Sequence, residues 1–402
     1  MAFNKSDKNC VLTINAGSSS IKFALYKIEK TLTKLWSGKM EGIGTKNTKL
    51  SFSNAATNQK NSLDLGALGH TATANFLIDW LEKQDDFVAV EAIGHRIVHG
   101  MKHTVPEQIT PALLEEFKEI SSYDPEHMPG AIQLIEGFGK RYPTLTQIAC
   151  FDTAFHTSMP LVAKLLSIPR RFQSMGIQRY GFHGLSYAWL MEELKRVAGR
   201  KTAQGRVILA HLGNGASLAA VKNGKSLDTS MGFTPTSGLP MGTRTGDLDP
   251  GVAWYLMQTE NLNAEEFNQL INHESGLLGI SETSADIREL IECRGTDTRA
   301  AEAIDLFCYQ TKKWIGSFAA ALGGLDTLIF SGGIGEHQPE IRKQICEGLE
   351  FLGIEWDETK NLQHEAIIST PKSKVCVRVI KTNEELMIAR LVCECLNYAI
   401  KN

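Results

Sequence analysis

The sequence predicts an α/β protein made of two related domains that face each other across a cleft. Three observations support this fold class. Strand-like and helix-like runs alternate throughout the chain, its 402 residues are enough for two or three domains, and one strand–turn–strand unit occurs twice. The two copies begin at Val11 and Val207, about half a chain apart. We therefore expect duplicated domains that each present a turn to the same ligand.

Short apolar runs bounded by turn residues predict the strands. They cover residues 11–14, 22–28, 92–99, 147–152, 207–210, 218–222, 327–330 and 375–381. The polar segment 46–62 is rich in Ser, Asn and Thr and predicts a solvated hairpin or loop of unassigned role. A largely apolar helix is expected to begin near Glu384 and to run to about residue 400.

Composition narrows the classes of partner. The 42 basic and 45 acidic side chains give a formal charge of −3, which argues against nucleic acid and anionic membranes as partners. Gly323, Gly324 and Asp326 interrupt the longest weakly polar stretch, so no membrane span is expected. The first twenty residues lack the apolar core of a signal peptide, which predicts a cytoplasmic protein. Eight cysteines without a C-x-x-C pair predict reduced thiols.

Three turns rich in small residues follow apolar strands. In the first, 15–22, backbone N–H groups, the Ser18 hydroxyl and Lys22 could contact a phosphate, although a plain hairpin is an equal alternative and the Walker A spacing is absent. The second, 211–217, predicts phosphate contact or, alternatively, a type I′ turn on Asn214–Gly215. The third, 331–336, could receive a base or ribose, or could simply connect a strand to a helix.

Two arginines suggest a site for anions, because guanidinium groups suit both carboxylate and phosphate. Arg96 lies in an apolar strand, where a charge is costly without a partner, and Arg244 lies in a polar loop. The alternatives are a structural ion pair for Arg96 and a solvated loop charge for Arg244. Asp152 ends another strand, where it could face a ligand or cap a helix.

Several other polar side chains have both a functional and a structural interpretation. His183 could donate to a phosphoryl group or be a satisfied buried ring. Glu384 and Asp286 could serve as a magnesium ligand and a ribose contact, or as acids in first helical turns. The helical metal spacing of His95, His99 and His103 is rejected, because their segment is predicted to be a strand.

With these features in order, the sequence resembles the acetate kinase family of the superfamily that includes sugar kinases, heat-shock ATPases and actin. The resemblance covers nearly the whole chain. It rests on NAGSSSIK at 15–22, GHRIVHG at 94–100, FDTAFH at 151–156, RYGFHG at 179–184, HLGNGAS at 211–217, MGTRTGD at 241–247, GGIGE at 332–336 and TNEEL at 382–386.

The resemblance implies two actin-like, ribonuclease-H-like ATPase domains around a central cleft, covering 1–152 plus 385–402 and 153–384. It implies a reversible transfer of the ATP γ-phosphoryl group to acetate with Mg²⁺ or Mn²⁺, giving ADP and acetyl phosphate, usually in a homodimer. The catalytic residues it implies are Arg96, Asp152, His183 and Arg244; the metal ligands are Asn15 and Glu384; the substrate pocket is Arg96, Val98, Phe182 and Pro235; and the nucleotide contacts are Ser18, Lys22, His211, Leu212, Gly213, Asn214, Gly215, Asp286, Ile287, Arg288, Gly333, Ile334, Gly335, Glu336 and His337.

Asp152 is not expected to act as a general base, because a carboxylate nucleophile carries no proton to remove. We interpret it as a group that orients an arginine or Mg²⁺. The chain departs from the family pattern at Glu126, Thr236 and Ser237, so a propionate or other short-chain carboxylate kinase is the alternative. A nucleotide-gated binding protein is the alternative from another class.

Overall fold

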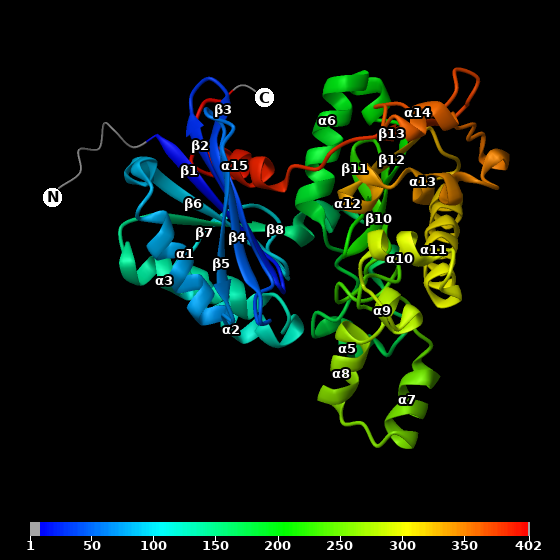
Figure 1. Ribbon diagram of the computed structural model, residues 1–402, viewed down its shortest axis with the longest axis horizontal. Coiled ribbons are helices and arrows are strands. Elements are labelled where there is room, and N and C mark those ends of the chain that lie inside the picture. The colour runs from blue at the N-terminus through cyan, green and yellow to red at the C-terminus, as the bar shows by residue number, and fades with distance from the viewer. Residues whose placement is uncertain (1–8, 401–402) are drawn as a thin grey trace. The chain divides into compact units, whose positions relative to one another are not determined.

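A computed structural model describes residues 9–400 (Figure 1). The chain forms two compact units. The first ends at Ala154 and resumes at Asn383, and the second is Phe155–Thr382. The sequence prediction placed these boundaries after residues 152 and 384.

Within residues 9–400 the first unit is built on an eight-stranded sheet of order β5-β4-β3-β2-β1-β6-β8-β7. Its strands are β1 (Cys10–Ala16), β2 (Ser20–Ile28), β3 (Leu32–Glu41), β4 (Thr48–Asn54), β5 (Lys60–Gly66), β6 (Val90–Ile97), β7 (Glu107–Gln108) and β8 (Thr146–Phe151). Its helices are α1 (His70–Leu81), α2 (Pro111–Ile120), α3 (Met128–Arg141) and α15 (Glu384–Cys395), with 3₁₀ turns at Asp85–Ala89 and Ser121–Tyr123.

Helices cover the two faces of this sheet differently. Successive side chains of a strand point to opposite faces. On β6, the His95 ring packs against Phe138 of α3, whereas a Cβ on Gly94 would lie 2.5 Å from Ile388 of α15. The helix α3 therefore covers one face, and α15, which packs on β1, β2, β6 and β8, covers part of the other (Figure 1).

The main apolar core lies on the α3 side of the sheet. It contains Phe23, Leu25, Trp36 and Leu50 from the strands, together with side chains of α1 and α3. Burial here lowers the pKa of His95 to about 4, so its ring is neutral, and its Nε2 is hydrogen-bonded to Gln147 Oε1 at 2.7 Å. His95 is therefore a structural histidine. It lies on the strand β6, and the sequence analysis had likewise predicted a strand and not a helix for this segment.

The second unit contains a five-stranded sheet, within the described residues, of order β11-β10-β9-β12-β13. Its strands are β9 (Arg206–Leu212), β10 (Ala216–Lys222), β11 (Lys225–Thr229), β12 (Thr327–Ser331) and β13 (Cys376–Val379). Its helices are α4 (Leu161–Lys164), α5 (Arg170–Ser174), α6 (Gly184–Ala203), α7 (Pro250–Thr259), α8 (Ala264–His273), α9 (Gly276–Ser281), α10 (Ile287–Cys293), α11 (Thr298–Leu322), α12 (Gly332–His337), α13 (Pro339–Cys346) and α14 (Glu358–Leu362). A 3₁₀ turn at Glu350–Leu352 completes the unit, and another, Asp152–Ser158, spans the boundary.

Local sequence accounts for the ends of the longest helix, α11. The Asp297 side chain caps its N-terminus by accepting from Arg299 N and Ala300 N. Gly323 ends it with a φ of 74°, the left-handed conformation that glycine adopts without a Cβ clash. The helix and β12 are thus separated at the glycines that the sequence indicated.

The two sheets share one topology, which confirms the duplicated α/β fold. In both units a three-stranded antiparallel meander is followed by two parallel strands: β3-β2-β1-β6-β8 in the first and β11-β10-β9-β12-β13 in the second. The turns β1–β2 and β9–β10, which the sequence matched to each other, occupy equivalent places.

Most predicted elements are confirmed, and two details change. Each predicted strand is present, and segment 46–62 contributes the hairpin β4–β5, whereas β3, β7 and β11 had not been predicted. The final helix ends at Cys395 instead of near residue 400, because the chain turns at Asn397, where φ is 59°. All eight cysteines are free. No helix in residues 9–400 is long and apolar enough to cross a bilayer.

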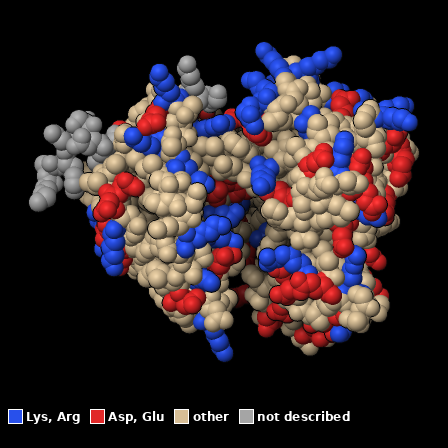
Figure 2. All heavy atoms as spheres, turned by 45° about the horizontal axis from the view of Figure 1, so that its top comes forward, with Lys and Arg blue, Asp and Glu red and all other residues tan. Residues whose placement is uncertain are grey.

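Acidic and basic side chains are interspersed over the visible surface (Figure 2). This distribution agrees with the near-balanced formal charge of −3. A local excess of basic or of acidic side chains would therefore be an exception on that surface.

The close contact of Gly94 with α15 leads to a first prediction. In Gly94→Ala the new methyl would meet Ile388 and Val392 side chains at 2.5 and 2.6 Å, so α15 must shift, and we expect a loss of about 1 to 3 kcal/mol of unfolding free energy. Gly316→Ala is the matched control: nothing lies within 4 Å of its Cβ on α11, and it should be stabilised by up to about 1 kcal/mol. Urea unfolding of both variants would test this; equal stability of Gly94→Ala and wild type would contradict it.

Candidate active site

Four polar side chains of the first unit form a buried cluster at one edge of its sheet. Arg96 Nε and Nη2 both donate to Asp152 Oδ2, at 3.0 and 2.6 Å, and Arg96 Nη1 donates to Asn15 Oδ1 at 3.1 Å. Asn15 Nδ2 donates to Glu384 Oε2 at 2.7 Å. Asn15, Asp152 and Glu384 are buried, with exposed fractions of 4%, 0% and 7%. The structure thus brings together four of the predicted site residues from β1, β6, the end of β8 and α15.

Electrostatics explain why these groups are charged and paired. Burial alone would lower the pKa of the Arg96 guanidinium, but the Asp152 and Glu384 carboxylates outweigh it and raise that pKa above its usual value. Arg96 is therefore always cationic and held in one orientation. The ion-pair alternative considered for Arg96 describes this geometry, and Asp152 orients the guanidinium by accepting from its Nε and Nη2.

The donor set at Asn15 and Glu384 fits a magnesium ion that keeps most of its waters. Mg²⁺ in nucleotide sites is typically held by one or two protein oxygens, with water and phosphate oxygens completing the shell. No group of three or more His, Cys, Asp or Glu side chains suited to a metal occurs among residues 9–400, which is compatible with such a sparse shell. Glu385 Oε1 also accepts from Asn15 Nδ2, at 3.2 Å.

The first turn joins β1 to β2 next to this cluster. Gly17 N donates to Ser20 O at 2.7 Å, which closes a tight hairpin. Ser18 is half-buried, and Lys22, paired in register with Asn15, is exposed. The backbone of this turn forms the hairpin that was considered as an alternative. Contact of Ser18 and Lys22 with a phosphate stays a prediction.

A second polar cluster lies in the second unit and centres on two stacked imidazoles. The rings of His183 and His211 lie 4.4 Å apart between centroids. His183 Nδ1 is hydrogen-bonded to Ser217 Oγ at 2.8 Å, and that hydroxyl is 2.5 Å from Tyr187 Oη. His211 Nδ1 is hydrogen-bonded to Ser186 Oγ at 2.8 Å. His183 has a φ of 58° before α6, and its Nδ1 contact leaves Nε2 as the ring atom near Gly215.

The β9–β10 turn is not the type I′ turn considered as an alternative. That turn needs positive φ at both central residues, and neither Asn214 nor Gly215 has one. Gly213 N instead donates to Gly215 O at 3.1 Å, and Gly242 N donates to Asn214 O at 2.9 Å. The loop is therefore set by its contact with the segment that carries Arg244.

Arg244 lies in an ordered loop beside the same turn, so the solvated-charge alternative is wrong. Its Nη1 donates to Pro235 O at 3.2 Å, and a Cβ on Gly215 would lie 3.4 Å from His183 Nε2 and 3.9 Å from Arg244 Nη1. Gly215, His183 and Arg244 therefore converge. This geometry places two potential donors to an anion next to a loop whose glycines, Gly213 and Gly215, are half-buried.

The predicted nucleotide contacts lie on two further elements of the second unit. Asp286 caps α10 by accepting from Arg288 N at 2.9 Å and pairs with the Arg288 guanidinium at 2.5 Å, so its capping alternative is confirmed. Glu336 Oε1 accepts from Gly332 N and from Thr382 N, both at 3.0 Å. Ile287 and Ile334 are buried, and His337 is exposed.

The residues predicted to form the substrate pocket belong to both units. Val98, next to β6, belongs to the first unit, and Phe182 and Pro235 belong to the second. Glu126 is half-buried in the first unit. Thr236 is one of the residues that depart from the family pattern. Its Oγ1 donates to Asn272 Oδ1 at 2.6 Å, so its hydroxyl is bound within the second unit.

Sequence reasoning missed the side chains that hold these residues in place. Ser217 and Tyr187 position His183, and the fully buried Arg342 donates through Nη1 to Gly335 O and Glu336 O, at 2.9 and 3.0 Å. Burial lowers the pKa of Arg342 to about 10. Ser217 alone had a signal, since it lies at the end of the HLGNGAS motif. Tyr187 and Arg342 occur in ordinary helical patterns that do not reveal their partners.

Comparison with known proteins identifies the family of the chain. The sequence profile of the acetokinase family matches residues 10–390. The chain belongs to the acetokinase family. It is 44% identical to an acetate kinase of Rhodopseudomonas palustris over 95% of this chain and 97% of that protein. Membership of this family makes the chain a kinase.

Two solved structures are similar over nearly their whole length. An acetate kinase from Porphyromonas gingivalis has a TM-score of 0.85 and 38% identity, covering 96% of this chain and 100% of that one. A propionate kinase from Francisella tularensis has a TM-score of 0.88 and 37% identity, covering 95% and 98%. The acetokinase fold is therefore shared by enzymes named for two different acids.

The buried pair of Arg96 and Asp152 leads to a second prediction. Removing one partner leaves a buried charge unpaired, so Arg96→Met and Asp152→Asn should each lose about 3 to 5 kcal/mol of unfolding free energy. The double variant should lose clearly less than the sum of the two, because neither charge is then left alone. Urea unfolding of the four proteins measures this coupling, and additive losses would contradict it.

Proposed function

We propose that this acetokinase-family chain transfers the γ-phosphoryl group of ATP reversibly to acetate, giving ADP and acetyl phosphate. The observation that carries the proposal is the Arg96 guanidinium, which is held by Asp152 and Asn15 in a family-matched segment. A fixed cation of this kind suits a carboxylate substrate and the acyl phosphate product equally.

The reaction needs no general base. A carboxylate oxygen attacks the γ-phosphorus, the bond from that phosphorus to the β–γ bridging oxygen breaks, and ADP leaves with the electron pair. Acetate is ionised at neutral pH, so Asp152 serves to orient Arg96 and does not remove a proton. Catalysis in such a transfer comes from positioning and from stabilising charge on the phosphoryl oxygens.

In our proposal, the second unit stabilises that charge. His183 Nε2 and the Arg244 guanidinium both lie next to Gly215 and would donate to the transferring group, while loop 211–215 contacts the nucleotide phosphates. The segments 286–288 and 333–337 would contact adenosine. A bound Mg²⁺, held by Asn15 and Glu384, would neutralise charge on the phosphate oxygens. A homodimer stays a prediction from the family resemblance, and a cytoplasmic location stays a prediction from the lack of a signal-peptide apolar core in the first twenty residues.

A second candidate function is phosphorylation of propionate. It is favoured by the likeness to the Francisella tularensis propionate kinase and by Glu126, Thr236 and Ser237, where the sequence departs from the usual family pattern. One methylene changes binding by only about 1 to 3 kcal/mol, so the acid has to be decided by measurement.

The third prediction is that acetate is the preferred acceptor. Purified protein with Mg-ATP and hydroxylamine should trap acyl phosphate from acetate with a higher kcat/KM than from propionate or butyrate. Preference for propionate would favour the second candidate. ATP turnover that is independent of any carboxylate would contradict both and would favour a nucleotide-gated binding protein.

The fourth prediction concerns Arg244. In Arg244→Ala, kcat should fall about 10²- to 10³-fold with little change in the KM for ATP, because the guanidinium meets charge that develops in the transition state. Arg200→Ala, which removes an exposed arginine of the same unit, should leave both constants unchanged. An unchanged kcat with a raised KM in Arg244→Ala would exclude the proposed role.

A further inference from the structure

A groove rich in lysine lies on the first sheet beside the start of α15. Its volume is about 570 Å³, and its walls come from β2, β3, β4, β5 and the start of α15. We call it the lysine groove. The polar residues that line it are Lys22, Tyr26, Lys34, Ser37, Lys39, Lys49, Ser51, Ser53, Lys60, Asn61, Ser62, Asn383 and Glu385.

Strand register explains how the groove forms. Gly94, Thr13, Ala24, Ser37, Ser53 and Lys60 are paired in sequence across β6, β1, β2, β3, β4 and β5, so they lie in one row on one face. The helix α15 packs on the Gly94 end of this row. Beyond β2 the row is uncovered, and its small side chains Ala24, Ser37 and Ser53 form the floor.

The neighbouring row supplies charge and links the groove to the buried cluster. Asn15, Lys22, Lys39, Ser51 and Ser62 are paired across β1 to β5. The uncovered part of this row, from β2 to β5, spans three strand spacings, or about 14 Å. Asn15 belongs to the candidate active site, whereas the strands β3, β4 and β5 contribute nothing to that site. The groove therefore adjoins the candidate active site and shares Lys22 with it, whereas its other lysines, on β3, β4 and β5, lie outside that site.

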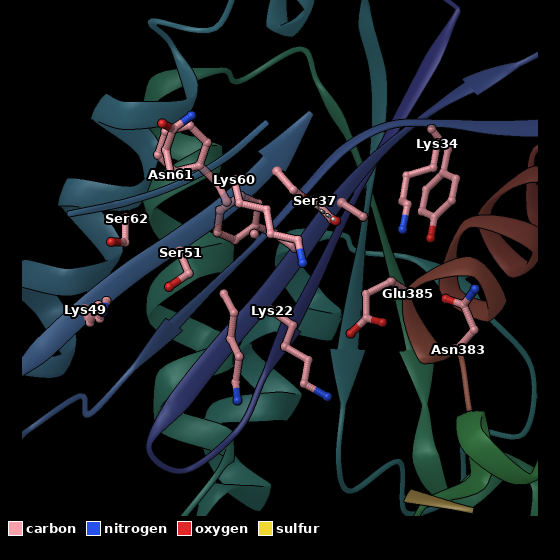
Figure 3. A pocket seen from close by; sticks show the side chains of 17 residues that line it. Lys22, Lys34, Ser37, Lys49, Ser51, Lys60, Asn61, Ser62, Asn383 and Glu385 are labelled. Carbon is pink, nitrogen blue, oxygen red and sulfur yellow. Dashed lines mark hydrogen bonds between the residues drawn. The ribbon is translucent and has the colours of Figure 1, made fainter. Parts of the chain in front are cut away.

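The charges in the groove are unbalanced. Five lysines line it, and Glu385 is the lining carboxylate. Among residues 9–400, Lys39 pairs with Glu41, whereas Lys22, Lys34, Lys49 and Lys60 form no ion pair. Figure 3 shows Lys22, Lys34 and Lys60 projecting from three strands around the groove, with Glu385 at its edge. Like charges gathered over a concave surface attract a counter-anion.

We propose that the lysine groove binds a small phosphorylated anion that carries two or more negative charges. Ammonium groups act as compact point charges for phosphate, and the hydroxyls of Ser37, Ser51, Ser53 and Ser62 add donors along the floor. The groove has no arginine, the side chain whose planar fork matches a carboxylate. Glu385 both lines the groove and accepts from Asn15 Nδ2, so an anion held there lies one contact from the active-site cluster.

Lysine footprinting of the full-length protein tests the site directly, with inorganic tripolyphosphate as the probe and neither Mg²⁺ nor substrate present. Acetylation of Lys39, Lys49 and Lys60 by an activated ester, followed by mass spectrometry, should slow several-fold with the probe. Lys30 and Lys372, which are exposed and lie outside the groove, should be unaffected. Equal slowing at these two lysines, or none at the groove lysines, would overturn the proposal.

Two further experiments distinguish binding of a phosphorylated ligand from a general effect of negative charge. Sodium chloride at matched ionic strength and citrate should protect the groove lysines less than tripolyphosphate; equal protection by citrate would overturn the assignment to a phosphorylated ligand. In calorimetry, Lys49→Glu/Lys60→Glu should bind tripolyphosphate at least about tenfold more weakly, whereas Lys30→Glu/Lys372→Glu should bind it as wild type does. Wild-type affinity in the groove variant would also overturn the proposal.

The outcome is independent of the proposed catalytic function. The groove variant should form acetyl phosphate at the wild-type rate, because neither Lys49 nor Lys60 belongs to the candidate active site. Loss of acyl phosphate formation in the wild type would therefore count against the function and leave the groove result standing. Loss in the groove variant alone would show that the groove and the active site are one, which would overturn the proposal of a distinct site.

Discussion

A guanidinium group placed in an apolar strand imposes the main constraint on the first unit. Arg96 can remain charged there only if anionic and carbonyl oxygens surround it, and the chain supplies them from three places: Asp152 at the end of β8, Asn15 on β1 and Glu384 at the start of α15. The strand order that makes β1, β6 and β8 neighbours is thus also what makes the charge tolerable. Apolar residues in place of a buried ion pair are often neutral or stabilising. Stability alone therefore does not account for these charged groups, whereas a role in binding an anion does.

The last helix, α15, constrains the structure of the whole first unit. It joins the first unit although 228 residues of the second unit separate them along the chain, and its apolar side chains Ile388 and Val392 fit against Gly94. The same packing brings Glu384 and Glu385 to Asn15. Because α15 packs mainly on β1, β2, β6 and β8, it leaves most of the serine- and lysine-lined strands β3 to β5 uncovered. One helix therefore defines both the buried cluster and the edge of the lysine groove.

In the second unit, glycines and hydroxyl groups position the candidate site residues, whereas in the first unit charged groups do so. A side chain on Gly242 would meet Asn214 Oδ1 at 2.0 Å, so the loop bearing Arg244 can approach loop 213–215 only without one. Ser217 and Tyr187 hold the His183 ring, and Arg342 holds the carbonyls of the third glycine-rich turn. These supporting contacts fix the positions of side chains that by themselves would be mobile.

The sequence by itself determined the class of the fold, the duplication, most strands and four residues that the structure brings together in the first unit, because alternation of apolar residues, glycine-rich turns and ordered motifs are local signals. It could not determine the β9–β10 turn type, since Asn214–Gly215 favours positive φ by propensity and the contact with Gly242 overrides that preference. Nor could it show that Asp152 pairs with Arg96, or reveal Tyr187, Arg342 and the lysine groove. Those outcomes depend on strand register and on a helix that comes from the far end of the chain, and only the tertiary structure brings such distant residues together.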